Sequence, residues 1–367
     1  MSEETFVELP PDAPPLPEAQ AAVPDVEYPI QFDGRAGEYF RIWIVNLALG
    51  IATLSLYGAW AKVRTQRYFY GNTRLAGVAF EYLAKPLPIL KGRLIALAVF
   101  AAYVLAGQVD IRIQLSLALV ILLLTPLLVV RGAMFRARYS SWRGLQFRFM
   151  PAYGQAYFCY LFLLFPMIFT FGLLYPLIKA KQKEFLVQNH RFGGVGFGFR
   201  ATTGQFYKIY LIAWAVLAVG SAVVVGALIG IVAPMKTGNA GAEPSAWVGI
   251  AMVVPIYAMY FVIFAFIAAA VTNLVFNHID IGPHRMRSTL RGSRLLWIYF
   301  SNTVAILASI GLLIPWAMVR LARYRADNLF VIARGDLGAF AGEPQGEVGA
   351  AAAEIDNVFD IDIGVGI

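Results

Sequence analysis

The chain has 367 residues, of which 59% are hydrophobic and 14% charged, with a mean hydropathy of +0.65 and a net charge of +8. Soluble globular proteins carry about 25% charged residues, and a bilayer is crossed by about 20 consecutive apolar residues. This composition excludes an ordinary soluble protein and indicates a polytopic membrane protein. The single cysteine, Cys159, excludes an intramolecular disulfide.

Both ends of the chain are acidic. Residues 1–27 are rich in proline and acids and lack the basic and apolar regions of a signal peptide, so no cleaved leader is expected. Residues 335–367 contain seven acids and no base. We predict that both are disordered tails, because neither has enough apolar surface to offset the entropy of ordering.

The rest of the chain is basic, with 29 Lys and Arg against six acids between Arg41 and Arg334. These bases stand beside apolar segments, which indicates anionic lipid headgroups as partners, and not nucleic acid. The apolar segments lie at about 42–61, 94–109, 113–130, 153–178, 209–235, 246–276 and 295–319.

An internal repeat organises the chain. A shift of 117 residues places Thr53 on Thr170 and Asn72 on Asn189, and a shift of 256 places Asn72 on Asn328. We predict repeat unit 1 at residues 28–130, unit 2 at 131–276 and a truncated unit 3 at 277–334.

The distribution of Lys and Arg predicts the topology. Segments 42–61, 153–178 and 295–319 each lie between flanks expected in the cytoplasm, because basic loops stay inside. We therefore predict that these three enter and leave the membrane as re-entrant hairpins, that the other four span it, and that both termini are cytoplasmic. A seven-span protein that violates the charge rule is the alternative.

The loops alternate apolar and polar residues in "YPIQFDG", "GVAFEYLAKP", "GLQFRFMP" and "GVGFGFRATT". Period two predicts small antiparallel hairpins or a shared sheet beneath the bilayer, with an apolar face of Phe32, Phe80, Phe149 and Phe197. The predicted fold class is an all-α polytopic membrane protein with internal repeats, re-entrant and transmembrane helical hairpins, and small cytoplasmic β-hairpins.

The stretches "FDGRAGEYFRIWIVNLALG" and "TLSLYGAWAKVRTQRYFYGNTRLAG" resemble the YjgN-like family of bacterial inner-membrane proteins, which is defined by a domain of unknown function. The resemblance covers about residues 28–334. Ala59 stands where the family often has proline, although Pro176 and Pro315 occupy the matching places of the other copies. The resemblance implies the bacterial inner membrane and supplies no reaction or substrate.

The repeated motif carries the candidate binding residues. Trp60 and Trp316 are expected at the headgroup level, and the spacing of the basic residues places each pair on one helical face. These basic residues are Arg64, Arg67, Arg320 and Arg323, with Lys181 as the counterpart in unit 2. They are either sites for a lipid headgroup or simple snorkelling anchors.

Polar residues inside the apolar segments form a second candidate group, comprising Asn46, Thr53, Thr170, Asn302 and Ser309. Such residues are costly in membranes and often functional. They would form the floor of a site at the re-entrant tips, or hydrogen-bond between segments and cap the broken turns.

No catalytic set, nucleotide motif or cofactor motif is present, and "HIDIGPH" lacks zinc-type spacing. We expect no enzyme, no metal and no cofactor. The favoured function is binding or movement of an anionic lipid or envelope amphiphile. The alternative is a non-catalytic scaffold whose acidic tails recruit a soluble partner, and a homo-oligomer is compatible with either.

Overall fold

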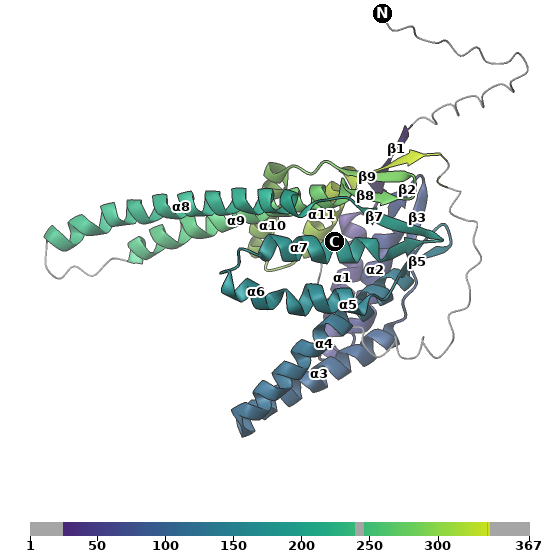
Figure 1. The fold of residues 1–367 in the computed structure, drawn as a ribbon, viewed down its shortest axis with the longest axis horizontal. Coiled ribbons are helices and arrows are strands. Elements are labelled where there is room, and N and C mark those ends of the chain that lie inside the picture. Colours follow the sequence, from purple (N-terminus) through teal and green to yellow (C-terminus); the bar gives the residue numbers. More distant parts are fainter. Residues whose placement is uncertain (1–24, 239–245, 336, 338–367) are drawn as a thin grey trace, which may run out of the picture.

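Ten short strands form one closed barrel in the computed structural model, which describes residues 25–238, 246–335 and 337 (Figure 1). The antiparallel order is β1-β10-β9-β8-β7-β6-β5-β4-β3-β2. The predicted all-α fold class is therefore wrong, because the strand segments close on one another instead of forming separate hairpins. The strands are β1 (Asp25–Phe32), β2 (Thr73–Leu75), β3 (Val78–Tyr82), β4 (Ser140–Trp142), β5 (Leu145–Phe149), β6 (His190–Phe192), β7 (Val195–Phe199), β8 (Ile279–Ile281), β9 (His284–Ser288) and β10 (Leu329–Arg334).

The predicted tails fall largely outside the described residues, which omit 1–24 and 338–367. Strand β1 begins inside the predicted N-terminal tail, at Asp25, and pairs with β10 to close the barrel. Tight turns join the consecutive strands: Ala76 and Gly77 have φ of 48° and 77°, and Arg143 and Gly144 have 51° and 77°. Two successive left-handed residues are typical of the two-residue turns that match strand twist.

Apolar side chains fill the barrel. Leu75, Trp142, Phe192 and Val331 are buried in one cluster, against which Phe80 and Phe197 pack. Phe32 and Phe149 instead belong to clusters shared with the helices. The predicted phenylalanine face is thus divided between the barrel interior and its helical end. A closed, filled barrel exposes no unpaired strand edge.

Five helical hairpins connect the strands, and each lies between two strands that pair with one another. All five therefore leave the same end of the barrel, as Figure 1 shows. The helices are α1 (Ala36–Ala52), α2 (Gly58–Gly71), α3 (Pro86–Val109), α4 (Ile111–Arg138), α5 (Tyr153–Tyr157), the π-helical η1 (Phe158–Phe162), α6 (Leu164–Phe169), α7 (Tyr175–Gln188), α8 (Thr203–Gly238), α9 (Ala246–Phe276), α10 (Gly292–Ala308) and α11 (Ile314–Asp327).

The same hydrogen bond recurs at every junction of hairpin and barrel. The residue just past one strand donates its backbone N–H to the carbonyl that ends the neighbouring hairpin. The donor–acceptor pairs are Asp33–Asn72, Leu83–Tyr139, Met150–Asn189, Arg200–His278 and Thr289–Asn328, at 2.8–3.0 Å. The molecule is therefore built from five strand–hairpin–strand units, and the second and fourth of them extend past residues 130 and 276, where repeat units 1 and 2 are predicted to end.

Two of the hairpins are long. The apolar helices of spanning length among the described residues are Pro86–Val109, Ile111–Arg138, Thr203–Ala227 and Val253–Phe276, the four segments predicted to span. The three motif segments form shorter hairpins: α1–α2, α5–α7 and α10–α11. Asn72 directly follows α2 with a φ of −96°, and its side chain donates to the Tyr68 carbonyl at 2.7 Å.

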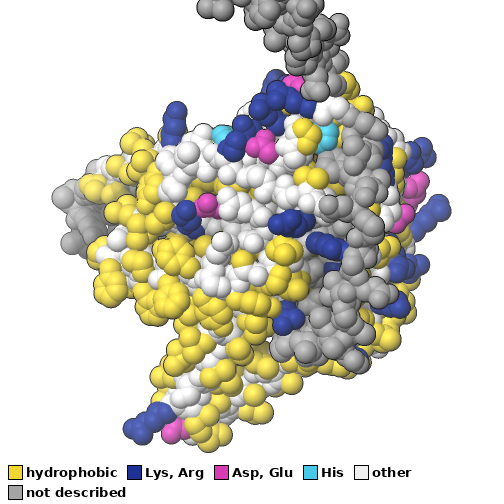
Figure 2. Space-filling view, turned by 45° about the vertical axis from the view of Figure 1, so that its right-hand side comes forward, with side chains coloured by type: hydrophobic (Ala, Val, Ile, Leu, Met, Phe, Trp, Pro, Cys, Tyr) yellow, Lys and Arg dark blue, Asp and Glu magenta, His cyan; other side chains and the backbone are white. Residues whose placement is uncertain are grey.

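The hairpins pack side by side in a ring above the barrel, with α2 against α3, α7 against α8 and α11 against α1. Two short hairpins are therefore neighbours at one place only, where α11 meets α1. Figure 2 shows that hydrophobic side chains cover the protruding hairpins and that Lys and Arg gather around the barrel end.

His284 makes barrel stability depend on pH. Its side chain is 3% exposed, its Nδ1 accepts the Arg334 backbone N–H at 3.2 Å, and burial lowers its pKa. The folded state thus binds fewer protons than the unfolded state, so stability is complete above the unfolded pKa of about 6.5 and is lost as pH falls below it. We expect thermal unfolding of His284→Asn, which keeps an acceptor, to depend less on pH between 7 and 5. If the unfolding temperature falls equally with pH in the wild-type protein and in His284→Asn, His284 is not the group responsible.

Candidate functional site

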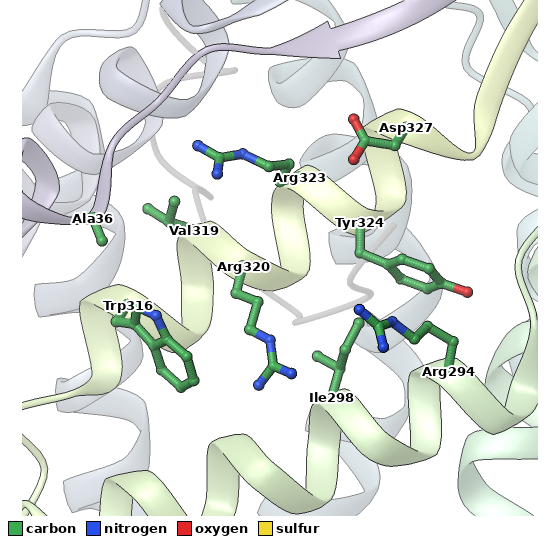
Figure 3. Close-up of a pocket in the computed structure, with 9 residues that line it drawn as sticks. All are labelled: Ala36, Arg294, Ile298, Trp316, Val319, Arg320, Arg323, Tyr324 and Asp327. Carbon is green, nitrogen blue, oxygen red and sulfur yellow. The ribbon is translucent and has the colours of Figure 1, made fainter.

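A cavity of about 270 Å³ lies between α10, α11 and the start of α1, at the place where two short hairpins are neighbours. Its lining residues are Ala36, Arg294, Ile298, Trp316, Val319, Arg320, Arg323, Tyr324 and Asp327 (Figure 3). Arg320 and Arg294 point toward the space between α10 and α11, whereas Arg323 points toward the segment between β1 and α1. The cavity therefore gathers three cations against one carboxyl.

Arg320 is held by several contacts. One guanidinium nitrogen donates to Ser301 Oγ at 2.6 Å and to Asn302 Oδ1 at 3.0 Å, and the guanidinium lies 5.0 Å from the centre of the Trp316 ring. Asn302 is buried and donates to the Ala317 carbonyl at 3.3 Å. These contacts fix the cation while leaving its other nitrogens available to a ligand, which favours recognition of an anion.

Arg323 donates to the Gly34 carbonyl at 2.9 Å and so joins α11 to the start of the chain's first hairpin. Asp327 lies one turn further along α11. Burial raises the pKa of the Asp327 carboxyl, and the charge of Arg323 opposes that shift. The carboxyl offsets part of the positive charge at the barrel end of the cavity, and it is the one acidic group among the lining residues that the structure describes.

Unit 1 has counterparts of Asn302, Trp316, Arg320 and Arg323, but they are arranged differently. Asn46 donates to the Ala61 carbonyl at 3.5 Å, which matches the bond from Asn302 to the Ala317 carbonyl in unit 3. The buried Oδ1 of Asn46, however, has no hydrogen-bond partner among the described residues. Arg64, the counterpart of Arg320, is exposed, and Trp60 stacks on Tyr57. Arg67 donates to the Ala84 carbonyl at 3.2 Å.

In unit 2, Lys181 forms an ion pair with Glu184 at 2.8 Å, so its charge is compensated. The structure thus brings the predicted residues Trp316, Arg320, Arg323 and Asn302 together in unit 3. It leaves four others outside this cavity: Trp60, Arg64 and Arg67 in the α1–α2 hairpin, and Lys181 in the α5–α7 hairpin.

The hydroxyls at the hairpin tips bond to backbone. Thr53 Oγ1 donates to the Leu49 carbonyl at 2.7 Å and accepts the Tyr57 N–H at 2.9 Å. Ser309 makes the matching pair with the Ile306 carbonyl and the Leu313 N–H, and Thr170 donates to the Pro166 and Met167 carbonyls. These contacts satisfy backbone groups at the ends of the helices.

Sequence reasoning missed Arg294, Ile298, Tyr324 and Asp327. Arg294 could have been noticed in the sequence, because the shift of 256 residues places it on Glu38. The charge at this position of the repeat therefore changes from negative in unit 1 to positive in unit 3. Tyr324 falls on Tyr68, and each hydroxyl contacts the backbone N–H and carbonyl of the residue before its hairpin, Arg291 or Arg35. Within the described part of the chain, no group of three His, Cys, Asp or Glu is placed to hold a metal ion.

Known proteins resemble this chain over most of its length. The inner membrane protein YjgN of Salmonella typhimurium is 25% identical and aligns with 83% of this chain and 88% of its own length. YjgN of Escherichia coli O157:H7 is 27% identical over 39% of this chain and 35% of its own length, and that of strain K12 is 29% identical over 32% and 30%. No solved structure matches the chain.

The family described as "Bacterial protein of unknown function (DUF898)" matches residues 27–358, which include all five hairpins and the cavity between α10 and α11. This agrees with the resemblance carried by the repeated motif. The chain belongs to this family of bacterial proteins.

Proposed function

We propose that the protein is a multi-pass protein of the bacterial inner membrane that binds an anionic lipid or envelope amphiphile at the cavity between α10 and α11. In this proposal the barrel and both termini are cytoplasmic, the two long hairpins span the bilayer, and the three short hairpins enter it from the cytoplasmic side.

The orientation is supported by charge. Bases such as Lys85, Arg138, Arg200 and Arg291 stand where helices meet the barrel. The far turn between α3 and α4 contains one acid, Asp110, and one base, Arg112, so its net charge is zero. Basic segments next to spans stay on the cytoplasmic side. Because all hairpins leave one end of the barrel, a cytoplasmic barrel places every basic junction on that side.

The tips of the short hairpins support partial insertion. Leu54, Phe171 and Ile310 are 90%, 98% and 95% exposed and have φ of 48°, 51° and 51°. Each follows a helix end at which glycine is the usual residue, because a left-handed backbone costs other residues about 1–2 kcal/mol. Bulky apolar side chains that are both strained and exposed are explained if the tips lie in lipid hydrocarbon.

The observation that carries the binding proposal is the convergence of Arg294 and Arg320 beside Trp316, at the base of a hairpin with an apolar tip. Guanidinium groups suit phosphate and carboxylate, and an indole suits the boundary between headgroup and acyl chain. An amphiphile could place its head between α10 and α11 and its chain along the exposed apolar residues toward Ile310.

The test is to replace Arg294 and Arg320 with Gln and to quantify the anionic lipid that co-purifies with the protein by mass spectrometry. Each base near an anionic ligand contributes about 1 kcal/mol, so the double variant should lose about 30-fold in affinity. The matched control, Arg64→Gln with Arg67→Gln, removes the same charge from unit 1 and should keep the lipid. Equal loss in both variants, at unchanged thermal stability, would mean that the arginines act only as general membrane anchors.

A further inference from the structure

A second cavity, of about 500 Å³, adjoins the first. It is lined by Arg291, Ser293, Arg294, Trp297, Tyr324 and Asn328, and it shares Arg294 and Tyr324 with the first cavity. Tyr324 keeps a fixed position between the two, because its hydroxyl accepts the Arg291 N–H at 2.9 Å and donates to the Arg291 carbonyl at 3.2 Å. The two cavities therefore form a continuous basic surface along α10 and α11.

The charges of this surface are unbalanced. The first cavity contains Arg294, Arg320 and Arg323 with Asp327, and the second contains Arg291 and Arg294 without an acid. Together they hold four arginines and one aspartate. Among the described residues, no acidic side chain forms an ion pair with Arg291 or Arg294, and both are exposed. One phosphodiester would neutralise only a third of the resulting net charge.

The two cavities follow one another along the hairpin instead of lying side by side at one level. Trp316 is nearest the tip, Arg320 is one turn further, and Asn328 and Arg291 are at the barrel end. With a rise of 1.5 Å per residue, Arg320 and Asn328 are separated by about 12 Å along α11. A ligand that entered from the bilayer would meet the Arg320 cavity first and the Arg291 cavity second.

Building on the proposed function, we propose that the ligand is an amphiphile whose headgroup carries two phosphate groups in series beyond its apolar chain. The first phosphate is bound by Arg320 and Arg294, and the second by Arg294 and Arg291. Arg294 contacts both phosphates because it lines both cavities. A lipid with two phosphates side by side at one depth would leave the Arg291 cavity empty.

The experiment compares two probes that differ by one phosphate, farnesyl monophosphate and farnesyl diphosphate. Their binding to the purified full-length chain in phosphatidylcholine nanodiscs is measured by calorimetry at fixed ionic strength. We expect Arg291→Gln to weaken diphosphate binding about five-fold and to change monophosphate binding less than two-fold. Arg320→Gln should weaken both probes.

A charge control is needed because a diphosphate binds more tightly to any basic surface. Arg325→Gln removes one exposed charge from α11 outside both cavities and should affect neither probe. If Arg325→Gln and Arg291→Gln weaken diphosphate binding equally, or if Arg291→Gln weakens neither probe, the second phosphate site is refuted while lipid binding at Arg320 stands. If neither probe binds and Arg294→Gln with Arg320→Gln retains the co-purified lipid, both proposals are refuted.

Discussion

Aspartate at Leu54, Phe171 and Ile310 together is expected to prevent stable membrane assembly of the protein. A carboxylate at the centre of a bilayer costs about 2.5–3.5 kcal/mol per residue on the insertion scale, so three cost up to about 10 kcal/mol at full depth. The measurement is the amount of folded protein that is recovered from membranes after carbonate washing, followed by its thermal stability in detergent.

Whether the substitutions lower or raise the yield and stability of the protein shows whether the hairpin tips lie in lipid or in water. Aspartate tolerates the left-handed backbone of these positions better than Leu, Phe or Ile, so tips in water would become more stable on substitution. Ala76→Asp is the control, since Ala76 also has a left-handed φ of 48° but lies in a barrel turn, away from the helical end. Improved yield of the triple variant would refute the re-entrant arrangement.

Aspartate at Val331 is expected to abolish the folded barrel. Val331 is 4% exposed and lies in the apolar cluster of the barrel interior, on the strand that closes it. An unpaired buried charge costs about 3–5 kcal/mol, a large part of the 5–15 kcal/mol by which most domains are stable. Limited proteolysis of membrane vesicles measures the loss as rapid cleavage within the barrel strands.

The neighbouring residue provides the control. Ile332 is half-buried and lies in register with Glu27 and Arg285, so an aspartate there meets one charge of each sign and should be tolerated. Equal protease resistance of Val331→Asp and the wild-type protein would show that the barrel interior admits water.

The four helices of spanning length and the family could be predicted from the sequence, because long apolar runs and a repeated motif are local signals. The alternation of apolar and polar residues likewise indicated strands β1, β3, β5 and β7. Strands of three residues such as β2 and β6 are too short to show period two. Closure of the barrel depends on the pairing of β1 with β10, from opposite ends of the chain, and no local pattern contains it.

The residues of the candidate cavity were predictable in part. The repeat identified Arg320, Arg323 and Trp316, but it gave equal weight to Arg64, Arg67 and Lys181. What distinguishes unit 3 is the set of neighbours: Ser301 replaces Val45 beside the asparagine, and Arg294 replaces Glu38. These differences gain meaning only when the packing of α10 against α11 is known, because the residues are far apart in sequence.

The pairing of β1 with β10 orders events during biosynthesis. A chain emerging from the ribosome cannot close the barrel until β10 is complete, by which time the helices of all five hairpins have been made. The barrel therefore closes only after every hairpin has been synthesised, and until then β1 and β9 are unpaired edges able to bind other strands. A chain stalled before Leu329 would thus contain the helices of all five hairpins and an open barrel with two exposed strand edges.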